Sequence, residues 1–339
     1  MAANKEVTFR YLNQAELKSV GLDMSLALKV VEEVMRLHTL KKDVLPHKIS
    51  MDLGEPERGR LNIMPGYVGG EFDTVGVKWI AIFPNNPQRF QLPSLSGLMV
   101  LGDPDRGTPV AVVESSLITS LRTGAATGVA AKYLARQDST SAAIIGAGVQ
   151  GRTQLMALHQ VLPQLKEARV YDVFPDAASR YADEMSAELG LPVRHVGSPQ
   201  ECVTGAQVVV TATVADEPIV KNAWLAKGCL FVHAGSNREE EDEVVLRSDA
   251  IFVDDWPGML HRRSQTLARM HEDGLINDQS ISAELGQVIL GQKPGRKSAD
   301  EQIYFCSVGM GTEDVALGYA AFRLAESKNV GTILNLFGS

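Results

Sequence analysis

The sequence predicts an α/β fold, in which a doubly wound parallel sheet of the Rossmann type is joined to a separate α+β domain. Three observations predict it. Residues 141–145 are apolar or small and lead into Gly146, Gly148 and Gly151, with apolar residues at helical spacing after them. Strand-like and helical stretches alternate from there onward. Before residue 114, by contrast, short strand-like stretches mostly follow one another.

The three glycines have the spacing of a dinucleotide-binding loop, Gly-x-Gly-x-x-Gly. Gly146 permits a tight turn, Gly148 lets a pyrophosphate approach the backbone, and Gly151 lets the helix pack close to the strand. The phosphates would bind free N–H groups at the start of that helix, so Val149 and Gln150 are also predicted to bind the cofactor.

A second strand is predicted at 168–173, and Asp172 lies near its end, 21 residues after Gly151. Such folds place an acid there to bind the ribose hydroxyls, and an acid favours NAD over NADP because a ribose phosphate would meet a like charge. The alternative is a chance glycine-rich turn beside an exposed aspartate, which the strand–turn–helix–strand context disfavours. Cofactor binding is further predicted where later strands end, at Thr211, Thr213 and Ser236.

Bulk composition is that of a globular protein with two domains: 339 residues, 45% hydrophobic and 22% charged. A net charge of −8 argues against a nucleic-acid surface. Neither a leader-like apolar segment nor a membrane-spanning run is found, so a cytoplasmic protein without a membrane partner is expected. Cys202, Cys229 and Cys306 are widely spaced, which fits reduced thiols and predicts no metal site.

The predicted domains comprise residues 1–132 with 307–339, and residues 133–306. The first is expected to have a helix at 25–40, turns at Pro65-Gly66 and 85–87, and strands at 7–12, 49–53, 60–64, 74–82, 98–101 and 109–113. A smooth, Gly- and Ala-rich helix at 115–135 links the domains. Later elements are strands at 141–145, 168–173, 193–196, 207–213, 228–233, 249–254 and 303–305, and helices at 257–273, 279–291 and 314–327.

Two cations are candidate catalytic residues. Arg122, near the middle of the long helix, is either a surface salt-bridge partner or an arginine that binds a carboxylate with both arms of its guanidinium. Lys78 is flanked by Val77 and Trp79, which strand alternation places on the opposite face. That pattern favours a functional lysine over one that points to solvent.

Other polar residues receive structural interpretations. Ser94 and Ser96 would either hydrogen-bond the substrate or cap a loop. The remaining expectations are a solvated loop or helix start for the acidic run 239–243, helix-start caps for Glu313 and Asp314, a structural histidine at 233, and turn capping by Asp254 and Asp255.

Several motifs, in this order along nearly the whole chain, resemble the ornithine cyclodeaminase/mu-crystallin family. They are Met64-Pro65, Val77-Lys78-Trp79, the stretch 121–126, the glycine loop, and the stretch 307–314. Within the family the likeness is greatest to dehydrogenases of siderophore biosynthesis that cleave an opine-like conjugate of two amino acids. The stretches 69–71, 253–256, 283–287 and 331–336 carry that finer likeness.

The resemblance implies a homodimer formed through the N-terminal β domain, which the C-terminal helix completes, and an active site between the two domains. It implies an NAD cofactor and a small substrate that bears an α-carboxylate, held by Lys78 and Arg122. Lys48 stands where many members have an arginine. The predicted site is completed by Met64, Ser94, Ser96 and Asn237 at the substrate, and by Thr123 and Met310 at the cofactor.

Asn237 distinguishes the possible activities. Family members that cyclise ornithine or lysine have an aspartate at the matching position, and asparagine takes up no proton in this pH range. The predicted function is therefore an NAD-dependent oxidoreductase acting on the C–N bond of an amino acid, imino acid or opine-like conjugate. The alternatives are a cyclodeaminase that recycles its NAD, and a non-enzymatic NAD(P)-bound carrier similar to mu-crystallin, against which Lys78 and Arg122 argue.

Overall fold

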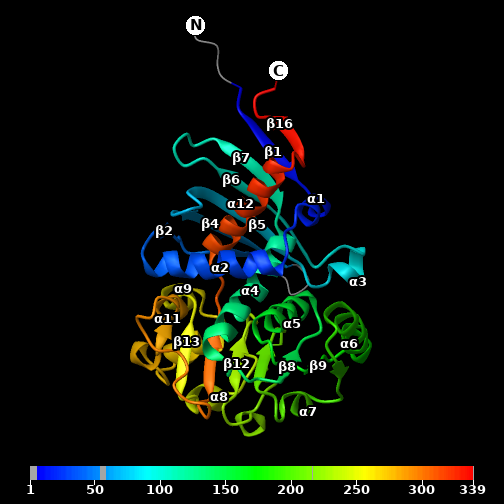
Figure 1. Cartoon of the computed structure of the whole chain (residues 1–339), viewed down its shortest axis with the longest axis vertical. Helices are drawn as coiled ribbons and strands as arrows, with labels where there is room; N and C mark the ends of the chain where they lie inside the picture. Colours follow the sequence, from blue (N-terminus) through cyan, green and yellow to red (C-terminus); the bar gives the residue numbers. More distant parts are fainter. Residues whose placement is uncertain (1–5, 54–58, 216, 339) are drawn as a thin grey trace. The chain divides into compact units, whose positions relative to one another are not determined.

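The computed structural model describes residues 6–53, 59–215 and 217–338. The chain forms two compact units: Met1–Arg122 with Met310–Ser339 (unit 1), and Thr123–Gly309 (unit 2) (Figure 1). From the sequence we placed the boundaries at 132/133 and 306/307. The first differs because helix α4 (Ser116–Leu134) is continuous through it, so the sequence carries no break there.

Unit 1 contains a mostly antiparallel sheet. Its strand order is β16 (Thr332–Asn335), β1 (Thr8–Leu12), β7 (Pro109–Glu114), β6 (Leu95–Gly102), β5 (Thr74–Ile82), β4 (Arg60–Val68), β2 (Asp43–Val44). The short strand β3 (Ile49–Asp52) pairs with β4 outside this order. Among the described strands of this sheet, only β1 and β7 pair in parallel.

Strand β4 continues through Pro65 and Gly66, so the turn predicted there is wrong. Pro65 pairs with Val77 of β5, whereas on its other side β4 pairs with β3 only up to Ile63 and with β2 only from Tyr67. Proline is tolerated because it lies in the gap between those two partners, where no ladder hydrogen bond is required of it.

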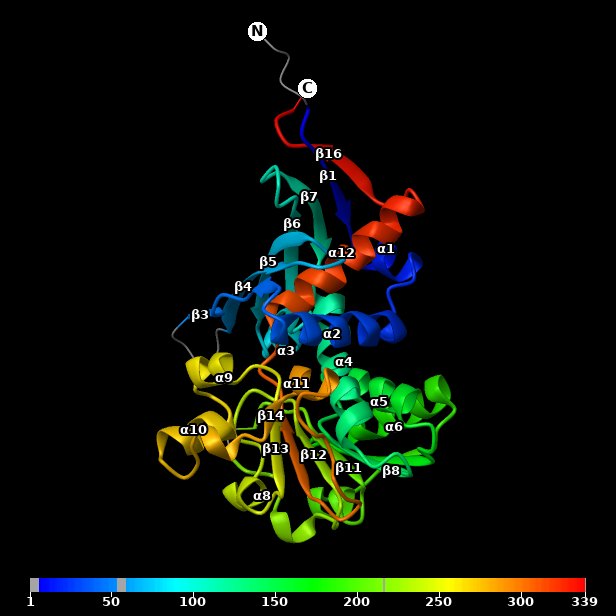
Figure 2. The same ribbon diagram turned by 60° about the vertical axis from the view of Figure 1, so that its left-hand side comes forward.

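Helices cover one face of this sheet. Helix α12 (Gly311–Ser327) packs on β4, β5 and β6, and α2 (Met24–Thr39) packs against α12 (Figure 2). A Cβ on Gly66 would lie 3.1 Å from the Thr312 side chain, so the glycine allows α12 to approach the strand closely. Two short helices, α1 (Gln14–Ser19) and α3 (Asn86–Phe90), also belong to the described part of this unit; α3 replaces the turn predicted at 85–87.

Unit 2 confirms the predicted doubly wound fold. Its eight described strands are all parallel, in the order β10 (Val193–His195), β9 (Glu167–Tyr171), β8 (Ser141–Ile145), β11 (Val208–Thr211), β12 (Leu230–His233), β15 (Ile303–Cys306), β13 (Ala250–Val253), β14 (Ala283–Glu284). In Figure 2 the labels β8, β11, β12 and β13 stand in this order across the sheet, and β15, which has no label there, lies between β12 and β13. The strand order reverses between β8 and β11, the point at which such sheets bind ligands.

The helices of unit 2 are α4, which begins in unit 1, α5 (Val149–Val161), α6 (Pro175–Leu189), α7 (Pro199–Val203), α8 (Asp242–Leu246), α9 (Trp256–Arg262), α10 (Thr266–Glu272) and α11 (Leu285–Ile289). The single helix predicted at 257–273 is two helices, because the chain turns at Arg263, whose φ is 61°. The helix predicted at 279–291 is mostly wrong: β14 takes Ala283–Glu284, and only α11 and the end of a 3-10 turn at Asp278–Ser280 are helical. Among the described helices none is both long and apolar enough to cross a bilayer.

Candidate active site

The glycine loop of unit 2 has an open anion-binding geometry. Gly146 has a φ of 110°, and a Cβ there would lie 2.5 Å from the Ala212 carbonyl oxygen. A Cβ on Gly151 would lie 2.0 Å from the Gly146 oxygen, so close packing requires glycine. At Gly148, which caps the N-terminus of α5, a Cβ would meet nothing within 4 Å. The start of α5 is therefore open to a phosphate.

Asp172 lies beside this loop, just after β9. Its Oδ2 accepts a hydrogen bond from the Ala147 N–H at 2.8 Å, and its Oδ1 accepts one from the Phe174 N–H at 3.0 Å. Each carboxylate oxygen has two lone pairs, so the group can also accept hydrogen bonds from the hydroxyls of a ligand. Asp172 and the open start of α5 thus belong to one site.

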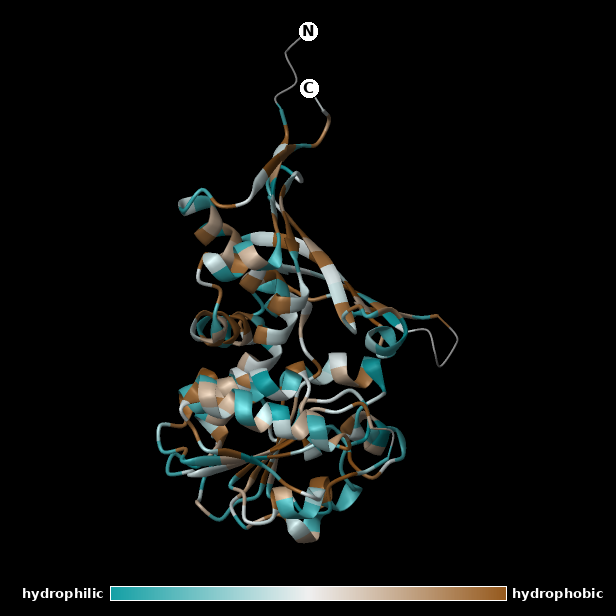
Figure 3. Cartoon of the chain, turned by 90° about the vertical axis from the view of Figure 1, so that its right-hand side faces the viewer, coloured by the Kyte–Doolittle hydropathy of each residue, from teal (hydrophilic) through white to brown (hydrophobic). Residues whose placement is uncertain are grey.

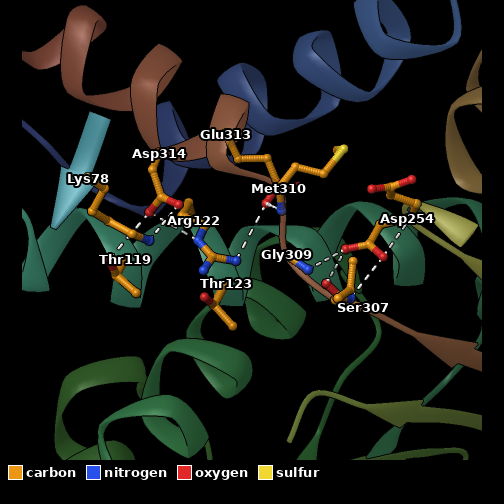
Figure 4. Close-up of polar contacts among 12 residues, drawn as sticks. Lys78, Thr119, Arg122, Thr123, Asp254, Ser307, Gly309, Met310, Glu313 and Asp314 are labelled. Atoms are coloured by element: carbon orange, nitrogen blue, oxygen red, sulfur yellow. Dashed lines mark hydrogen bonds and ion pairs between the residues drawn. The ribbon is translucent and has the colours of Figure 1, made fainter. Parts of the chain in front are cut away.

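A buried ion cluster lies in unit 1, where α12 begins (Figure 4). The Nζ of Lys78 is 2.6 Å from Oδ2 of Asp314, and both side chains are fully buried. The Nε of Arg122 donates to Oδ1 of Asp314 at 3.2 Å. One carboxylate therefore joins the two cations that the sequence singled out.

Two more residues belong to this cluster. The Thr119 hydroxyl, one helical turn before Arg122, donates to Oδ1 of Asp314 at 3.3 Å. Buried Glu313 is 3.5 Å from Nη1 of Arg122 and accepts a hydrogen bond from the Met310 N–H at 3.3 Å. Glu313 is thus a cap, as expected. The helix cap expected at Asp314 is wrong, because its carboxylate points to Lys78 and Arg122. Thr119 is a member of the cluster that the sequence did not reveal.

The cluster changes the proton affinity of its members. Burial lowers the pKa of Lys78 to about 8. The negative charge of Asp314 opposes this shift, and the positive charge of Arg122 adds to it. Burial alone would raise the pKa of Asp314, but the positive charges of Arg122 and Lys78 outweigh it and lower that pKa. Lys78 can therefore gain or lose a proton near neutral pH.

The other predicted substrate residues divide between the two faces of the sheet. Met64 pairs with Lys78 across β4 and β5, so both buried side chains lie on the helix-covered face. Lys48 is half-buried immediately before β3. Ser96 pairs with Ala81 and lies on the opposite face from Lys78, and Ser94 is exposed before β6. The fold of this chain thus does not bring the two serines to Lys78.

The remaining predicted cofactor residues lie mostly where strands of unit 2 end. Buried Thr211 is the last residue of β11, and Thr213 follows it. Ser236 and Asn237 follow β12, and the Asn237 Nδ2 donates to the Val214 carbonyl at 3.4 Å. Thr123 lies in α4, where its carbonyl accepts from Gln154 Nε2 at 3.4 Å, and Met310 is the buried N-cap of α12 in unit 1.

The acidic run 239–243 is not simply a solvated loop. Glu239 and Glu240 are fully buried, and only the end of the run begins helix α8. The Nδ1 of His233 lies 2.9 Å from Glu240 Oε2, and the Tyr304 hydroxyl donates to Glu240 Oε1 at 2.6 Å. These partners replace the water that the buried Glu240 carboxylate would otherwise require.

Asp254 also has a larger role than the turn capping that was predicted. Its carboxylate accepts hydrogen bonds from Ser307 Oγ, from the Val308 N–H and from the Gly309 N–H at 2.7–2.8 Å. Asp255 does cap α9, through the Gly258 N–H at 3.2 Å. Asp254 thus fixes the segment by which the chain leaves unit 2.

Among the described residues, no group of three or more His, Cys, Asp or Glu residues is arranged to hold a metal.

Comparison with known proteins places the chain in a family. The model of the ornithine cyclodeaminase/mu-crystallin family matches residues 11–328. The chain belongs to this family. Among its relatives is the N-((2S)-2-amino-2-carboxyethyl)-L-glutamate dehydrogenase of Staphylococcus aureus, 33% identical over an alignment of 335 residues that covers 96% of this chain and 98% of the relative.

Solved structures of family members agree with the fold. The Δ1-pyrroline-2-carboxylate reductase of Thermococcus litoralis, in complex with NADH and L-proline, is 34% identical with a TM-score of 0.89, covering 96% of this chain and 99% of that one. An archaeal alanine dehydrogenase dimer with bound NAD is 33% identical with a TM-score of 0.87, covering 97% of this chain and all of that one.

Proposed function

We propose that the protein is an NAD-dependent oxidoreductase that acts on the C–N bond of an amino acid, an imino acid or an opine-like amino-acid conjugate. The observation that carries this proposal is the buried cluster of Lys78, Arg122 and Asp314 in a family member that also has an open glycine loop with Asp172 beside it. The names of relatives support it, because they describe dehydrogenases or reductases of amino and imino acids.

The cofactor site is proposed to be the carboxyl edge of the parallel sheet in unit 2. The opening at Gly148 and the N-terminus of α5 suit a pyrophosphate, and Asp172 suits two ribose hydroxyls. A ribose phosphate would bring its charge against the Asp172 carboxylate, so NAD is favoured over NADP. When bound, the nicotinamide supplies the hydride chemistry, which leaves the protein to bind, orient and move protons.

The substrate site is proposed to be the cluster in unit 1, where Lys78 and Arg122 would hold the α-carboxylate. Their burial strengthens each contact, because charges interact more strongly away from water. Glu313 and Asp314 balance the two cations, so the four groups are neutral together before a substrate carboxylate is added. We propose that Lys48 supplies the third positive charge.

Lys78 is also proposed to move protons. Oxidation of an amine gives an imine, and the attack of water on the imine requires proton transfers. A lysine with a pKa of about 8 holds or releases a proton at neutral pH far more readily than an ordinary lysine. Asp314 would keep its Nζ in place during those transfers.

Net consumption of the cofactor tests the proposed function. A panel of amino acids and conjugates with NAD, and of 2-oxo acids and amines with NADH, would be followed at the NADH absorbance band. We expect stoichiometric oxidation or reduction with at least one pair. Ornithine or lysine supplied with only catalytic NAD is the opposing test. Many turnovers to ammonia without accumulation of NADH would contradict the proposal and favour a cyclodeaminase, despite Asn237.

We further propose that the protein forms a homodimer through the uncovered face of the sheet in unit 1, its substrate-binding and dimerisation domain. Side chains of this face are apolar and paired across strands: Trp79 opposes Leu98, and Val77 opposes Val100. In the single chain, Trp79 is 44% exposed and Leu98 is 42% exposed. An apolar face that stays this exposed is typical of a surface that another protein covers. Figure 3 shows the long helices of this unit on one side of the sheet.

Three buried free thiols support a reducing, cytoplasmic location.

A further inference from the structure

A buried chain of ionisable groups in unit 2 has no part in the function described so far. The Tyr304 hydroxyl binds Glu240, and Glu240 binds Nδ1 of His233. The Nε2 of His233 lies 3.7 Å from Oε2 of Glu239. All four side chains are fully buried. The Glu240–His233 pair balances its own charge, so Glu239 is an additional acid that the pair does not require.

Glu239 holds the segment that follows β11. Its Oε1 accepts hydrogen bonds from both the N–H and the hydroxyl of Thr213, each at 2.5 Å. The same hydroxyl accepts a hydrogen bond from the Ala215 N–H at 3.1 Å. The backbone and side chain of Thr213 are therefore oriented by this one carboxyl oxygen.

Glu239 also lies against the segment that follows β12. A Cβ on Gly235 would be only 2.0 Å from Oε2 of Glu239, so the carboxyl group occupies the space that a side chain at 235 would take. The Gly235 carbonyl is fixed on its other side by Gln265 Nε2 at 3.0 Å. One carboxyl group thus supports two adjacent loops at the carboxyl edge of the sheet.

Those two loops lie in the second half of the dinucleotide fold. The glycine loop and Asp172 follow β8 and β9, on one side of the point where strand order reverses. Thr213 and Gly235 follow β11 and β12, on the other side. A dinucleotide lies across that point, one nucleotide over each half, so the adenosine end lies over the first half and the nicotinamide end over the second.

We infer that Glu239 is a positioning residue for the nicotinamide end of the cofactor, acting through Thr213 and through the loop at Gly235. The inference rests on the proposed function, since it needs NAD(H) to bind. Burial raises the pKa of Glu239, which favours the neutral carboxyl group. Glutamine can reproduce that form: its carbonyl oxygen accepts from Thr213, and its amide takes the place of the protonated Oε2.

Binding of NADH and of ADP tests the inference without any need to know the substrate. NADH engages both halves of the fold, whereas ADP engages only the glycine loop and Asp172. Glu239→Ala should weaken NADH binding about tenfold and leave ADP binding within about twofold, because it removes two hydrogen bonds of the second half. Glu239→Gln should keep NADH binding within about threefold of the unchanged protein. Exposed Glu243→Gln, on the same acidic run, is the matched control and should change neither.

Gly235→Ala keeps the test decisive if Glu239→Ala fails to fold. The new methyl group would displace the Glu239 carboxyl from Thr213, so the same selective loss of NADH binding is expected. Unchanged NADH binding in the alanine variants would overturn the inference, and so would an equal loss of NADH and ADP. Failure of the unchanged protein to bind NADH would instead overturn the proposed function.

Discussion

Lys78 and Asp314 form an ion pair with 2.6 Å between Nζ and Oδ2, and neither side chain is reached by solvent. The pair connects the middle of β5 with the first turn of α12. Arg122 approaches the other oxygen of the same carboxylate. Taking such charges out of water is costly unless each has a partner, so the three residues depend on one another.

Removal of both members of the Lys78–Asp314 pair should cost less stability than the two single removals added together. Asp314→Leu leaves Lys78 buried without its acid and should reduce the free energy of unfolding by about 3–5 kcal/mol. The double variant Lys78→Met/Asp314→Leu should lose clearly less than the sum of the single variants, because no lysine charge is then stranded. Urea unfolding measures this. Additive losses would show that the two side chains are not coupled.

Activity should fall as the pH rises through the pKa of Lys78, which is about 8. The protonated lysine is the form that holds a carboxylate, so kcat/KM should decline above that pH. Asp314→Asn removes the negative charge that favours the ammonium, and should move the decline to lower pH. The pH profile of kcat/KM is the measurement, with exposed Lys18→Met as control. A profile without a decline in this range would contradict the role of Lys78.

Asp172 should set the choice of nucleotide. Asp172→Ser removes the carboxylate that repels a ribose phosphate, so the preference for NADH over NADPH should fall by about tenfold or more. Some NADH affinity should also be lost, because the Ala147 and Phe174 N–H groups lose their acceptor. Titration with both nucleotides checks this. Equal affinity of the unchanged protein for NADH and NADPH would refute the role proposed for Asp172.

Local patterns were sufficient for much of the fold and for part of the site. The strand–turn–helix at Gly146 follows from residues close in sequence, and strand alternation correctly placed Lys78 on the face opposite Val77 and Trp79. These features depend on backbone conformation and strand alternation, which neighbouring residues determine.

Contacts between distant residues were not accessible in the same way. Asp314 lies 192 positions from Arg122, so from the sequence alone a helix cap was the simpler interpretation. The burial of Glu240 depends on Tyr304, 64 positions away. Pro65 predicts a turn when only its neighbours in sequence are considered, because the gap that β2 and β3 leave beside β4 is formed by residues elsewhere in the chain. Each error comes from a tertiary partner that local composition does not reveal.

Adjacent Asp254 and Asp255 should differ in their effect on stability. Asp254→Ala leaves the buried donors of Ser307, Val308 and Gly309 without their acceptor and should cost about 3–5 kcal/mol. Asp255→Ala removes the cap of α9 and should cost about 0.5–2 kcal/mol. Urea unfolding of both variants provides the comparison. Similar losses would show that the segment 307–309 does not depend on Asp254.

The proposed dimer should depend on the uncovered sheet face of unit 1. Trp79 and Leu98 are directly opposed on β5 and β6, and the same cross-strand row includes Ile63 on β4 and Ile49 on β3. A charge introduced into this row would be buried without a partner in the dimer, whereas in a monomer it would remain in water. Trp79→Glu and Leu98→Glu should therefore yield monomers in light scattering at micromolar concentration, with the fold retained by circular dichroism. Leu246→Glu, at an equally exposed apolar residue of α8 in unit 2, should leave the dimer intact. A monomeric unchanged protein would refute the dimer. Dimers that persist in both glutamate variants would show that the interface lies on another surface.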